Sequence, residues 1–357
     1  MKILAIETSC DETAISIVTA EGDLNAPQFK ILAHCVSSQV ALHAPFGGVV
    51  PNIAKREHLK NLPIVLTQAL AEANLTEDSA KKNIDAIAVT VGPGLEPALW
   101  TGIEFAKKLA LEWDKPLIPT NHLEGHILSP LLKGQKIVTP AVALVASGGH
   151  TELVLVKNLG EYEKIGQTKD DAAGEAFDKV ARLLGLPYPG GPNLSKLASA
   201  ISSQDTWHLP RPMFNSPDYH FSFSGLKTAV LYAKKNYEQE HGRELNEKEK
   251  AELAFEFENA VVEVLVKKTL KAVRDFNAQT VVVGGGVIAN TRLRETLARE
   301  LALHFAEVTL LLPPMDLATD NATMIAMAGY LRYLKNEFIT PADIPSANIS
   351  ANGNLNF

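Results

Sequence analysis

Cysteine is scarce in this chain: only two residues, Cys10 and Cys35, occur among its 357 amino acids. Two cysteines can form neither a disulfide framework nor a cysteine-rich zinc site. Because a few reduced cysteines are typical of cytosolic proteins, we expect a cytoplasmic location.

Long apolar runs are also missing. The apolar start of the chain, residues 3–6, is followed at once by Glu7 and Glu12, whereas a signal peptide needs a longer uncharged stretch. Other apolar runs, such as residues 140–146 and 281–283, are too short to span a bilayer. We therefore expect no membrane association.

An excess of positive charge is absent too. The chain has 34 Lys and Arg against 41 Asp and Glu, a net charge of −7. Since affinity for phosphate depends mainly on Lys and Arg, any work on RNA would need a local basic patch or a partner. The hydrophobic content of 46% excludes a largely disordered chain. The length suits about two domains.

Strand and helix patterns alternate, which predicts an α/β protein. Residues 2–6 and 14–18 are apolar segments around a polar turn, as in a β-hairpin. Residues 84–91 resemble a buried strand, followed by Gly92-Pro93-Gly94 and a helix pattern over 97–113. A helix that begins after such a turn can hold an anion at its N-terminus.

The same pattern returns in the second half of the chain. Residues 141–146 and 152–156 predict the strands of a hairpin around the polar turn 147–151. Residues 280–283 predict a strand that leads through three glycines into a helix over 290–303. We therefore expect a duplicated architecture, although residue identity between the halves is low.

Three further segments complete the predicted organisation. Residues 247–276 predict a long helix with one buried face, because Leu253, Phe257, Val261 and Leu265 follow one another at steps of four. A last helix is expected over residues 320–334. The tail from Ile339 onward is rich in Pro, Ser and Asn, so we expect it to be irregular.

The sharpest local feature is the sequence NHLEGH at residues 121–126. Asn121 suits the N-cap of a short helix, on which His122 and His126 lie one turn apart on the same face. Two imidazoles at that spacing can share a metal ion; a pair of packed or surface histidines is the alternative. In a zinc protease the glutamate directly follows the first histidine. Glu124 instead lies about 200° around the helix, which argues against a protease centre.

Glycines follow two of the predicted buried strands, at residues 148–149 and 284–286. Glycine lets backbone N–H groups approach a phosphate closely, but tight turns use it as well. Neither segment is a Walker loop or a dinucleotide-binding fingerprint. Their occurrence in both halves favours a nucleotide between them.

Acidic side chains cluster at Asp170, Asp171, Glu175 and Asp178. They suit contacts with ribose hydroxyls or a metal, but also the N-terminus of a helix, where the helix dipole favours negative charge. Asp320 stands at the start of the last predicted helix. An ordinary N-cap is the simplest local interpretation of that residue.

Seven motifs occur in the order in which one known family has them, and they extend over nearly the whole chain. They are residues 6–13 (IETSCDET), the pair His122 and His126, and residues 147–151 (SGGHT), 171–179 (DAAGEAFDK), 188–192 (YPGGP), 223–227 (FSGLK) and 319–321 (TDN). The chain resembles the bacterial type of the universal tRNA threonylcarbamoyltransferase family, formerly called O-sialoglycoprotein endopeptidases.

The resemblance implies an actin/Hsp70/sugar-kinase-like (ASKHA) α/β fold, with two RNase-H-like lobes around a nucleotide cleft. We expect residues 1–135 plus 320–357 to form the N-terminal lobe and residues 136–319 the C-terminal lobe. The implied activity transfers the threonylcarbamoyl group of threonylcarbamoyl-AMP to N6 of adenosine 37, in tRNAs that read ANN codons.

The resemblance also implies roles for individual residues. It makes His122, His126 and Asp320 ligands of one divalent metal ion, iron (Fe²⁺) or zinc, in place of the N-cap interpretation of Asp320. The residues implied to contact the substrate or a nucleotide (ATP, ADP or threonylcarbamoyl-AMP) are Val145, Ala146, Ser147, Gly148, Gly149, Asp178, Gly191 and Asn290. Asp11 and Glu12, at the first hairpin turn, are candidate proton acceptors.

The implied partners are an ANN-decoding tRNA, a catalytically inactive paralogue that forms a heterodimer with this chain, and a small ATPase. A separate synthase would supply the threonylcarbamoyl-AMP. The tRNA-binding surface includes Lys55-Arg56 or Lys234-Lys235, a choice that the sequence leaves open. Departures from the family pattern at Glu96-Pro97, residues 316–318 and Ala322 concern partner contacts and loop geometry rather than the proposed metal ligands.

Two other functions remain open on sequence grounds. A small-molecule kinase of the same fold would transfer the γ-phosphate of ATP, since a fold alone does not determine the reaction. Such kinases hold Mg²⁺ through oxygen ligands, so the histidine pair argues against this alternative. The third possibility is a non-catalytic scaffold that responds to nucleotide.

Overall fold

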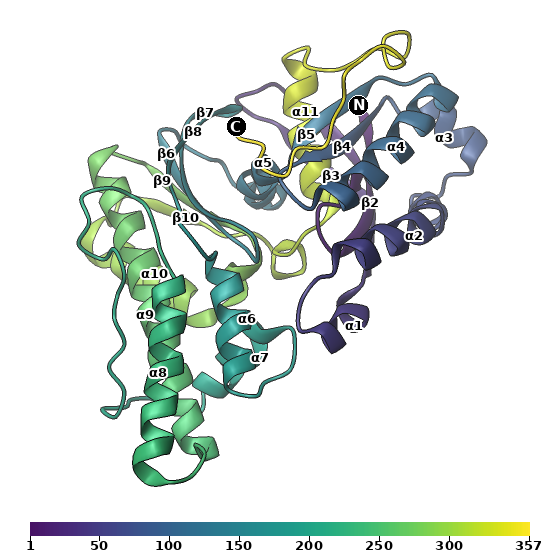
Figure 1. Cartoon of the computed structure of the whole chain (residues 1–357). Coiled ribbons are helices and arrows are strands. Elements are labelled where there is room, and N and C mark those ends of the chain that lie inside the picture. Colours follow the sequence, from purple (N-terminus) through teal and green to yellow (C-terminus); the bar gives the residue numbers. More distant parts are fainter.

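The computed structural model describes all residues 1–357 and contains two five-stranded sheets (Figure 1). The strands of the first sheet are β1 Lys2–Glu7, β2 Glu12–Glu21, β3 Gln28–Ser38, β4 Ala86–Gly92 and β5 Leu117–Asn121. Those of the second are β6 Ala141–Ala146, β7 Thr151–Asn158, β8 Glu161–Gln167, β9 Thr280–Gly284 and β10 Thr309–Leu311.

The two sheets have one topology. Their orders are β3-β2-β1-β4-β5 and β10-β9-β6-β7-β8, so β6 takes the place of β1 and β9 that of β4. In each sheet the three strands that come first in the sequence (β1–β3 or β6–β8) pair antiparallel. The two later strands (β4 and β5, or β9 and β10) extend the sheet in parallel. The predicted duplication is therefore confirmed at the level of strand order.

Helices cover both faces of each sheet. The first half of the chain contains α1 Val40–His43, the 3-10 turn η1 Ala44–Phe46, α2 Pro51–Glu72, α3 Glu77–Asn83, α4 Glu96–Trp113, α5 His122–Leu128 and η2 Ser129–Lys133. The second half contains α6 Ala173–Leu183, α7 Gly190–Ala198, α8 Ser224–His241, α9 Glu247–Asp275, η3 Gly286–Ala289, α10 Thr291–His304, η4 Met315–Leu317 and α11 Ala322–Leu334.

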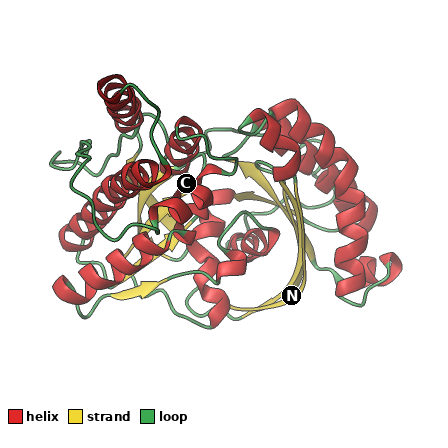
Figure 2. Cartoon of the chain, turned by 90° about the horizontal axis from the view of Figure 1, so that it is seen from below, coloured by secondary structure: helices red, strands yellow, loops and turns green.

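Three hydrophobic cores hold these layers together. One joins the first sheet to α2 and α4, and another joins the second sheet to α6 through α10. The third lies between the sheets, where α5 and α11 contribute buried side chains, and Figure 2 shows helices enclosed between the two sets of strands. Successive residues of β1 serve different cores: Leu4 and Ile6 face outward, Ile3 and Ala5 inward. Both sheets are thus buried on two faces, which explains their continuous apolar strands.

Most of the predicted segments exist as expected. The long helix is α9, and the residues after α11 form turns without helix or strand. The last helix begins at Ala322 rather than at Asp320. Every helix falls short of the length and apolar character that a bilayer-crossing segment requires. The lobe boundaries at residues 135 and 320 stay a prediction.

Candidate functional site

Helix α5 begins as the sequence predicted. The side-chain Oδ1 of Asn121 accepts hydrogen bonds from the N–H groups of Leu123 (2.8 Å) and Glu124 (3.4 Å). Asn121 is therefore the N-cap, and one turn of helix separates His122 from His126. Both imidazoles are buried, and their Nε2 atoms lie 3.2 Å apart.

The carboxylate of Asp320 joins this pair from the opposite end of the chain. Its Oδ1 lies 3.1 Å from Nε2 of His126 and 3.3 Å from Nε2 of His122. The cap of α11 is Asn321, whose Oδ1 accepts the N–H of Met324 at 3.0 Å. The N-cap interpretation of Asp320 is therefore wrong, because the next residue caps the helix and leaves Asp320 free to face the imidazoles.

Glu7 is a member of the site that the sequence analysis did not single out. This fully buried residue of β1 accepts a hydrogen bond from Nδ1 of His122 at 3.0 Å. It also accepts one from Oγ1 of Thr90 at 2.6 Å and one from the N–H of Ser9. A proton on Nδ1 leaves the lone pair of the His122 Nε2 atom directed at Asp320. A glutamate in an otherwise apolar strand was the available signal, since a buried carboxylate needs partners.

The donor set fits a transition metal. One ligand atom each from His122, His126 and Asp320 lie within 4.8 Å of one another, and two imidazoles with one carboxylate suit zinc or ferrous iron. Burial lowers the pKa of His122, but the charges of Asp320 and Glu7 outweigh it and raise that pKa well above its ordinary value. An environment that favours positive charge on His122 to this extent also favours a divalent cation.

Glu124 points away from these donors, as the spacing predicted. Its Oε2 accepts a hydrogen bond from Nε of Arg332 at 2.9 Å, on the far side of α5. The carboxylate is thus committed to an ion pair and does not take the position of the general base in a zinc protease.

The β6–β7 hairpin turn offers two free backbone amides, those of Gly148 and Gly149. The N–H of Ser147 donates to the carbonyl of His150 at 2.8 Å, within the turn itself. The N–H groups of Gly148 and Gly149 have no such partner, and a Cβ added at either glycine would meet nothing within 4 Å. Val145 and Ala146 precede the turn with buried side chains. Only Gly148 and Gly149 therefore present unpaired amides to an anion.

Two of the three glycines at 284–286, Gly284 and Gly285, have a packing role. Gly285 has a φ of +86°, and a Cβ there would lie 2.4 Å from the carbonyl oxygen of Ala146. A Cβ on Gly284 would lie 2.7 Å from the carbonyl oxygen of His126. The end of β9 thus passes very close to the end of β6 and to the helix that carries the histidines, which only glycine permits.

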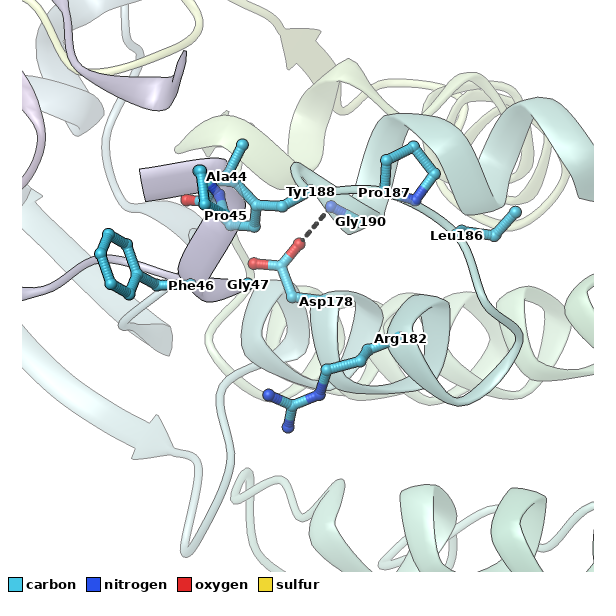
Figure 3. A pocket seen from close by; sticks show the side chains of 10 residues that line it. All are labelled: Ala44, Pro45, Phe46, Gly47, Asp178, Arg182, Leu186, Pro187, Tyr188 and Gly190. Carbon is cyan, nitrogen blue, oxygen red and sulfur yellow. Dashed lines mark hydrogen bonds between the residues drawn. The ribbon is translucent and has the colours of Figure 1, made fainter. Parts of the chain in front are cut away.

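Asp178 lies on α6 and lines a pocket that is bordered on its other side by the turn 44–47. Its Oδ1 accepts the N–H groups of Gly190 (2.7 Å) and Gly191 (3.2 Å), and its other oxygen points toward Gly47 (Figure 3). Burial raises the pKa of Asp178, although these two hydrogen bonds oppose the shift. The acid is therefore held in place with one oxygen available.

Asn290 is fully engaged inside the second lobe. It caps α10, with its Oδ1 accepting the N–H of Leu293 at 2.8 Å. Its amide nitrogen donates to Oγ of Ser195 (2.9 Å) and to Oε1 of Glu258 (2.6 Å). Both amide protons thus have protein partners, so the side chain positions η3 and α10 beside α7.

Asp170 has a structural role as well. Its carboxylate accepts the N–H groups of Phe223 and Ser224 and the hydroxyls of Ser222 and Ser224. It thereby caps α8 from outside that helix. Asp171 pairs with Lys179 at 2.7 Å. Glu175 pairs with the same lysine at 2.9 Å. Asp178 has no cationic partner and keeps one oxygen free, so the ribose interpretation remains open for it.

Asp11 and Glu12 lie at the turn between β1 and β2. Asp11 is buried, and its Oδ2 has no hydrogen-bond partner. Burial and the charges of Asp320 and Asp11 raise the pKa of Glu12 well above its ordinary value. The carboxyl group of Glu12 is thus near enough to Asp320, a predicted metal ligand, for the two charges to interact.

A solved structure supports the fold. The chain aligns with full-length HypF, whose structure is described as phosphate- and nucleotide-bound, with a TM-score of 0.58 and 14% sequence identity. The alignment spans 94% of this chain and 55% of that protein. The paired sheets of equal topology and this likeness confirm the predicted ASKHA-type fold.

Comparison with curated sequences identifies the family. Residues 30–327 match the family model described as tRNA N6-adenosine threonylcarbamoyltransferase. A protein of that name from Thermosipho africanus is 49% identical over 335 residues, which are 94% of this chain and 95% of that protein. Another, from Chromobacterium violaceum, is 48% identical over 344 residues, 96% and 95% of the two chains. The chain therefore belongs to the tRNA N6-adenosine threonylcarbamoyltransferase family.

Proposed function

We propose that the chain transfers a threonylcarbamoyl group from threonylcarbamoyl-AMP to N6 of adenosine 37 in ANN-decoding tRNAs. The observation that carries this proposal is the convergence of His122, His126 and Asp320 within 4.8 Å in the cleft of a chain from this family. The nitrogen-rich donor set does not suit the oxygen-held Mg²⁺ of a kinase.

The three side chains would hold one divalent ion, iron or zinc. When bound, the ion supplies positive charge that orients the donor and stabilises negative charge on the carbonyl oxygen. The free amides of Gly148 and Gly149 bind the donor phosphate, and Asp178 and Gly191 border the nucleotide.

The reaction is an acyl-type transfer. The N6 amine of adenosine attacks the carbamoyl carbon, and the bond to AMP breaks, so that AMP leaves with the electron pair. Because an aryl amine is a weak nucleophile, positioning of the two substrates contributes most. The amine proton passes to Glu12 or Asp11.

Partners belong to the same proposal. A tRNA substrate, an inactive paralogue, a small ATPase and a donor synthase would act together with this chain in the cytoplasm. Of the two basic segments, Lys55-Arg56 is the better tRNA contact: both side chains are exposed and lack a carboxylate partner. Lys234 instead pairs with Glu238 at 2.8 Å.

Transfer of labelled threonine to tRNA, reconstituted with the purified partners, tests the proposal. Substituting His126→Ala removes a ligand, and we expect at least a hundredfold loss of transfer with an unchanged circular dichroism spectrum. His304→Ala, an exposed histidine of α10, is the matched control and should keep full activity. Full transfer by His126→Ala without bound metal would refute the ligand assignment.

A further inference from the structure

A histidine that the proposed reaction does not use lies behind the β1–β2 turn. His58 stands in the first half of α2, on the face that packs against the first sheet, and its side chain is fully buried. A buried imidazole needs partners for both ring nitrogens, since an unpaired polar group away from water is costly. The partners of His58 therefore show what this side chain holds in place.

The two ring nitrogens of His58 hold the residues on either side of Asp11 and Glu12. Nε2 lies 3.0 Å from the carbonyl oxygen of Cys10, and Nδ1 lies 2.8 Å from Oγ1 of Thr13, which is also fully buried. One rigid ring thus bridges the residue before the two candidate proton acceptors and the residue after them. It thereby fixes the backbone from which both carboxyl groups project.

The chemistry of these partners determines where the ring carries its proton. A carbonyl oxygen can only accept, so the proton of the neutral imidazole is on Nε2, and Nδ1 is an acceptor. Nδ1 then accepts from the hydroxyl of Thr13 and from the side-chain amide of Gln39, 3.3 Å away. Burial lowers the pKa of His58, which agrees with a neutral ring. The imidazole is therefore held in one tautomer and one orientation.

A second histidine continues this chain of hydrogen bonds to the start of α2. The amide nitrogen of Gln39 also donates to the carbonyl of Ala54 at 3.5 Å, which leaves its Oε1 directed at His43. Nε2 of His43 donates to that oxygen at 3.2 Å, and its Nδ1 accepts the N–H of Val50 at 3.3 Å. Both side chains are buried. Every donor from Val50 to the carbonyl of Cys10 thus has its acceptor, and all of them point the same way.

The backbone of Gln39 adds one more contact to the turn. Its N–H donates to the carbonyl of Asp11 at 2.9 Å, so two successive carbonyl groups of the turn have partners outside the β1–β2 hairpin. The side-chain Oδ2 of Asp11 has none. A restrained backbone that leaves a carboxyl oxygen unpaired is what a group that must accept a proton at a fixed place requires.

We propose that His58 is a positioning residue for the transfer reaction: by bridging the two sides of the β1–β2 turn, it holds the carboxyl groups of Asp11 and Glu12 where the amine proton is delivered. The inference rests on the proposed function, in which these two residues accept that proton. All hydrogen-bond partners of His58 are groups behind the turn, so its substitution should lower kcat and leave the KM for tRNA unchanged.

Two substitutions of His58 in the full-length chain, assayed with the purified partners, test this role. His58→Asn keeps an acceptor near the position of Nδ1 but removes the donor to Cys10, whereas His58→Gln keeps a donor near the position of Nε2. A general base contributes roughly 100-fold or more to a rate, and a displacement of about 1 Å can cost as much. We therefore expect His58→Asn to lower kcat about tenfold and His58→Gln to restore most of it.

The hydroxyl of Thr13 provides a second, isosteric test that leaves no cavity. Thr13→Val removes the donor to Nδ1 and should lower kcat severalfold, while Thr13→Ser keeps the hydroxyl and should retain the wild-type value. The matched control is Thr269→Val, because this equally buried hydroxyl donates at 2.8 Å to Leu265 of its own helix α9. An equal loss of kcat in Thr13→Val and Thr269→Val would overturn the inference.

Hydrogen–deuterium exchange of the peptide that contains residues 8–13 reports on the turn without any enzymatic assay. Exchange should be faster in His58→Asn and Thr13→Val than in the wild type and in Thr269→Val. Unchanged exchange in both turn variants, or faster exchange with an unchanged kcat, would refute the positioning role. If the wild type transfers no threonine, the proposed function fails, whereas exchange that depends on His58 would still show that this residue holds the turn.

Discussion

Glu7 fixes the tautomer of a candidate metal ligand from a strand 115 residues away in sequence. Substitution Glu7→Gln keeps the shape of the side chain but removes the charge that stabilises the Nδ1 proton of His122. Because such carboxylate partners contribute 10- to 100-fold to metal affinity, we expect about a tenfold weaker affinity for Zn²⁺. Competition with a chromophoric chelator measures it without any enzymatic assay.

The matched control for this change is Glu124→Gln. Glu124 is equally buried and lies on the helix of the two histidines, but it pairs with Arg332 on the far side. Its substitution should leave the affinity for Zn²⁺ unchanged. Equal affinities of the wild type and Glu7→Gln would show that Glu7 does not position His122.

The thiol of Cys35 provides a prediction on reactivity. Burial and the hydrogen bond to Glu72 (3.1 Å) raise the pKa of Cys35 to about 12. Only the thiolate is alkylated, so iodoacetamide should modify Cys35 slowly at pH 8. Glu72→Gln should accelerate the modification, roughly tenfold for each unit by which the pKa falls. Mass spectrometry follows the rate, and Glu77→Gln, which should have no effect, is the control.

At the residue scale, the sequence predicted side chains whose neighbours are local and missed those with distant partners. The helix cap Asn121 and the orientation of Glu124 follow from spacing along one helix. The role of Glu7 depends on His122, which follows β5 and is distant in sequence. The role of Asn290 depends on its hydrogen bonds to Ser195 and Glu258. Only the resemblance to the family identified Asp320 as a candidate metal ligand, because its position before the last predicted helix favoured an N-cap.

At the scale of elements, α8 depends on an acid that precedes it by more than fifty residues. Asp170→Ala removes the acceptor for the amides of Phe223 and Ser224, and loss of an N-cap costs about 1–2 kcal/mol of the free energy of unfolding. Urea denaturation at pH 7 measures the difference. Asp205→Ala, an exposed loop residue without hydrogen bonds, is the control and should change stability little.

The loss of stability caused by Asp170→Ala should become smaller as the pH falls. Burial opposes ionisation, but hydrogen bonds from Ser222 and Ser224 outweigh it and lower the pKa of Asp170 in the folded chain. Its contribution is therefore complete above the unfolded pKa of about 3.9 and is lost as the pH falls through the lower folded value. A stability difference that grows on acidification would contradict this assignment.

The predicted elements were those with a full hydrophobic pattern. Strands β1, β4, β6 and β9 are buried on both faces and read as continuous apolar segments. Strand β3 was not predicted; only one of its residues is fully buried, and polar residues at both ends and in the middle interrupt its apolar pattern. Helix α2 was not predicted either, since Pro63 interrupts its helical sequence pattern.

At the scale of the whole molecule, the last residues of the chain connect the two lobes. The N–H of Asn352 donates to the carbonyl of Val91 at 2.9 Å. The amide of Asn121 donates to the carbonyl of Asn356 at 3.2 Å, while Lys164 donates to the Asn356 side chain. Figure 1 shows this segment running along the N-terminal lobe to end beside β7 and β8.

The departure from the family pattern at Glu96 has a local explanation in this segment. Oε1 of Glu96 accepts the N–H of Gly353 at 3.3 Å, and the N–H of Gly94 donates to the carbonyl of Gly353. The glutamate at the start of α4 thus holds the final residues against the lobe.

Deleting residues 352–357 should lower the free energy of unfolding by about 3 kcal/mol, since several hydrogen bonds of about 1 kcal/mol each are lost. Urea denaturation checks this value. Lys164→Ala removes the hydrogen bond to the Asn356 side chain together with the ion pair to Glu152 (3.5 Å). Because Lys164 is partly exposed, the substitution should cost only about 1 kcal/mol. An unchanged midpoint for the truncated chain would mean that these contacts do not stabilise the fold.

The contact between Asn356 and Asn121 has a practical consequence for anyone who purifies this protein. A polyhistidine tag fused after Phe357 would begin beside the cap of the helix that bears His122 and His126. Its imidazoles would compete for the same ion and would disturb both metal analysis and affinity titrations. An affinity handle inserted in the exposed surface loop around Asp205 would avoid that interference.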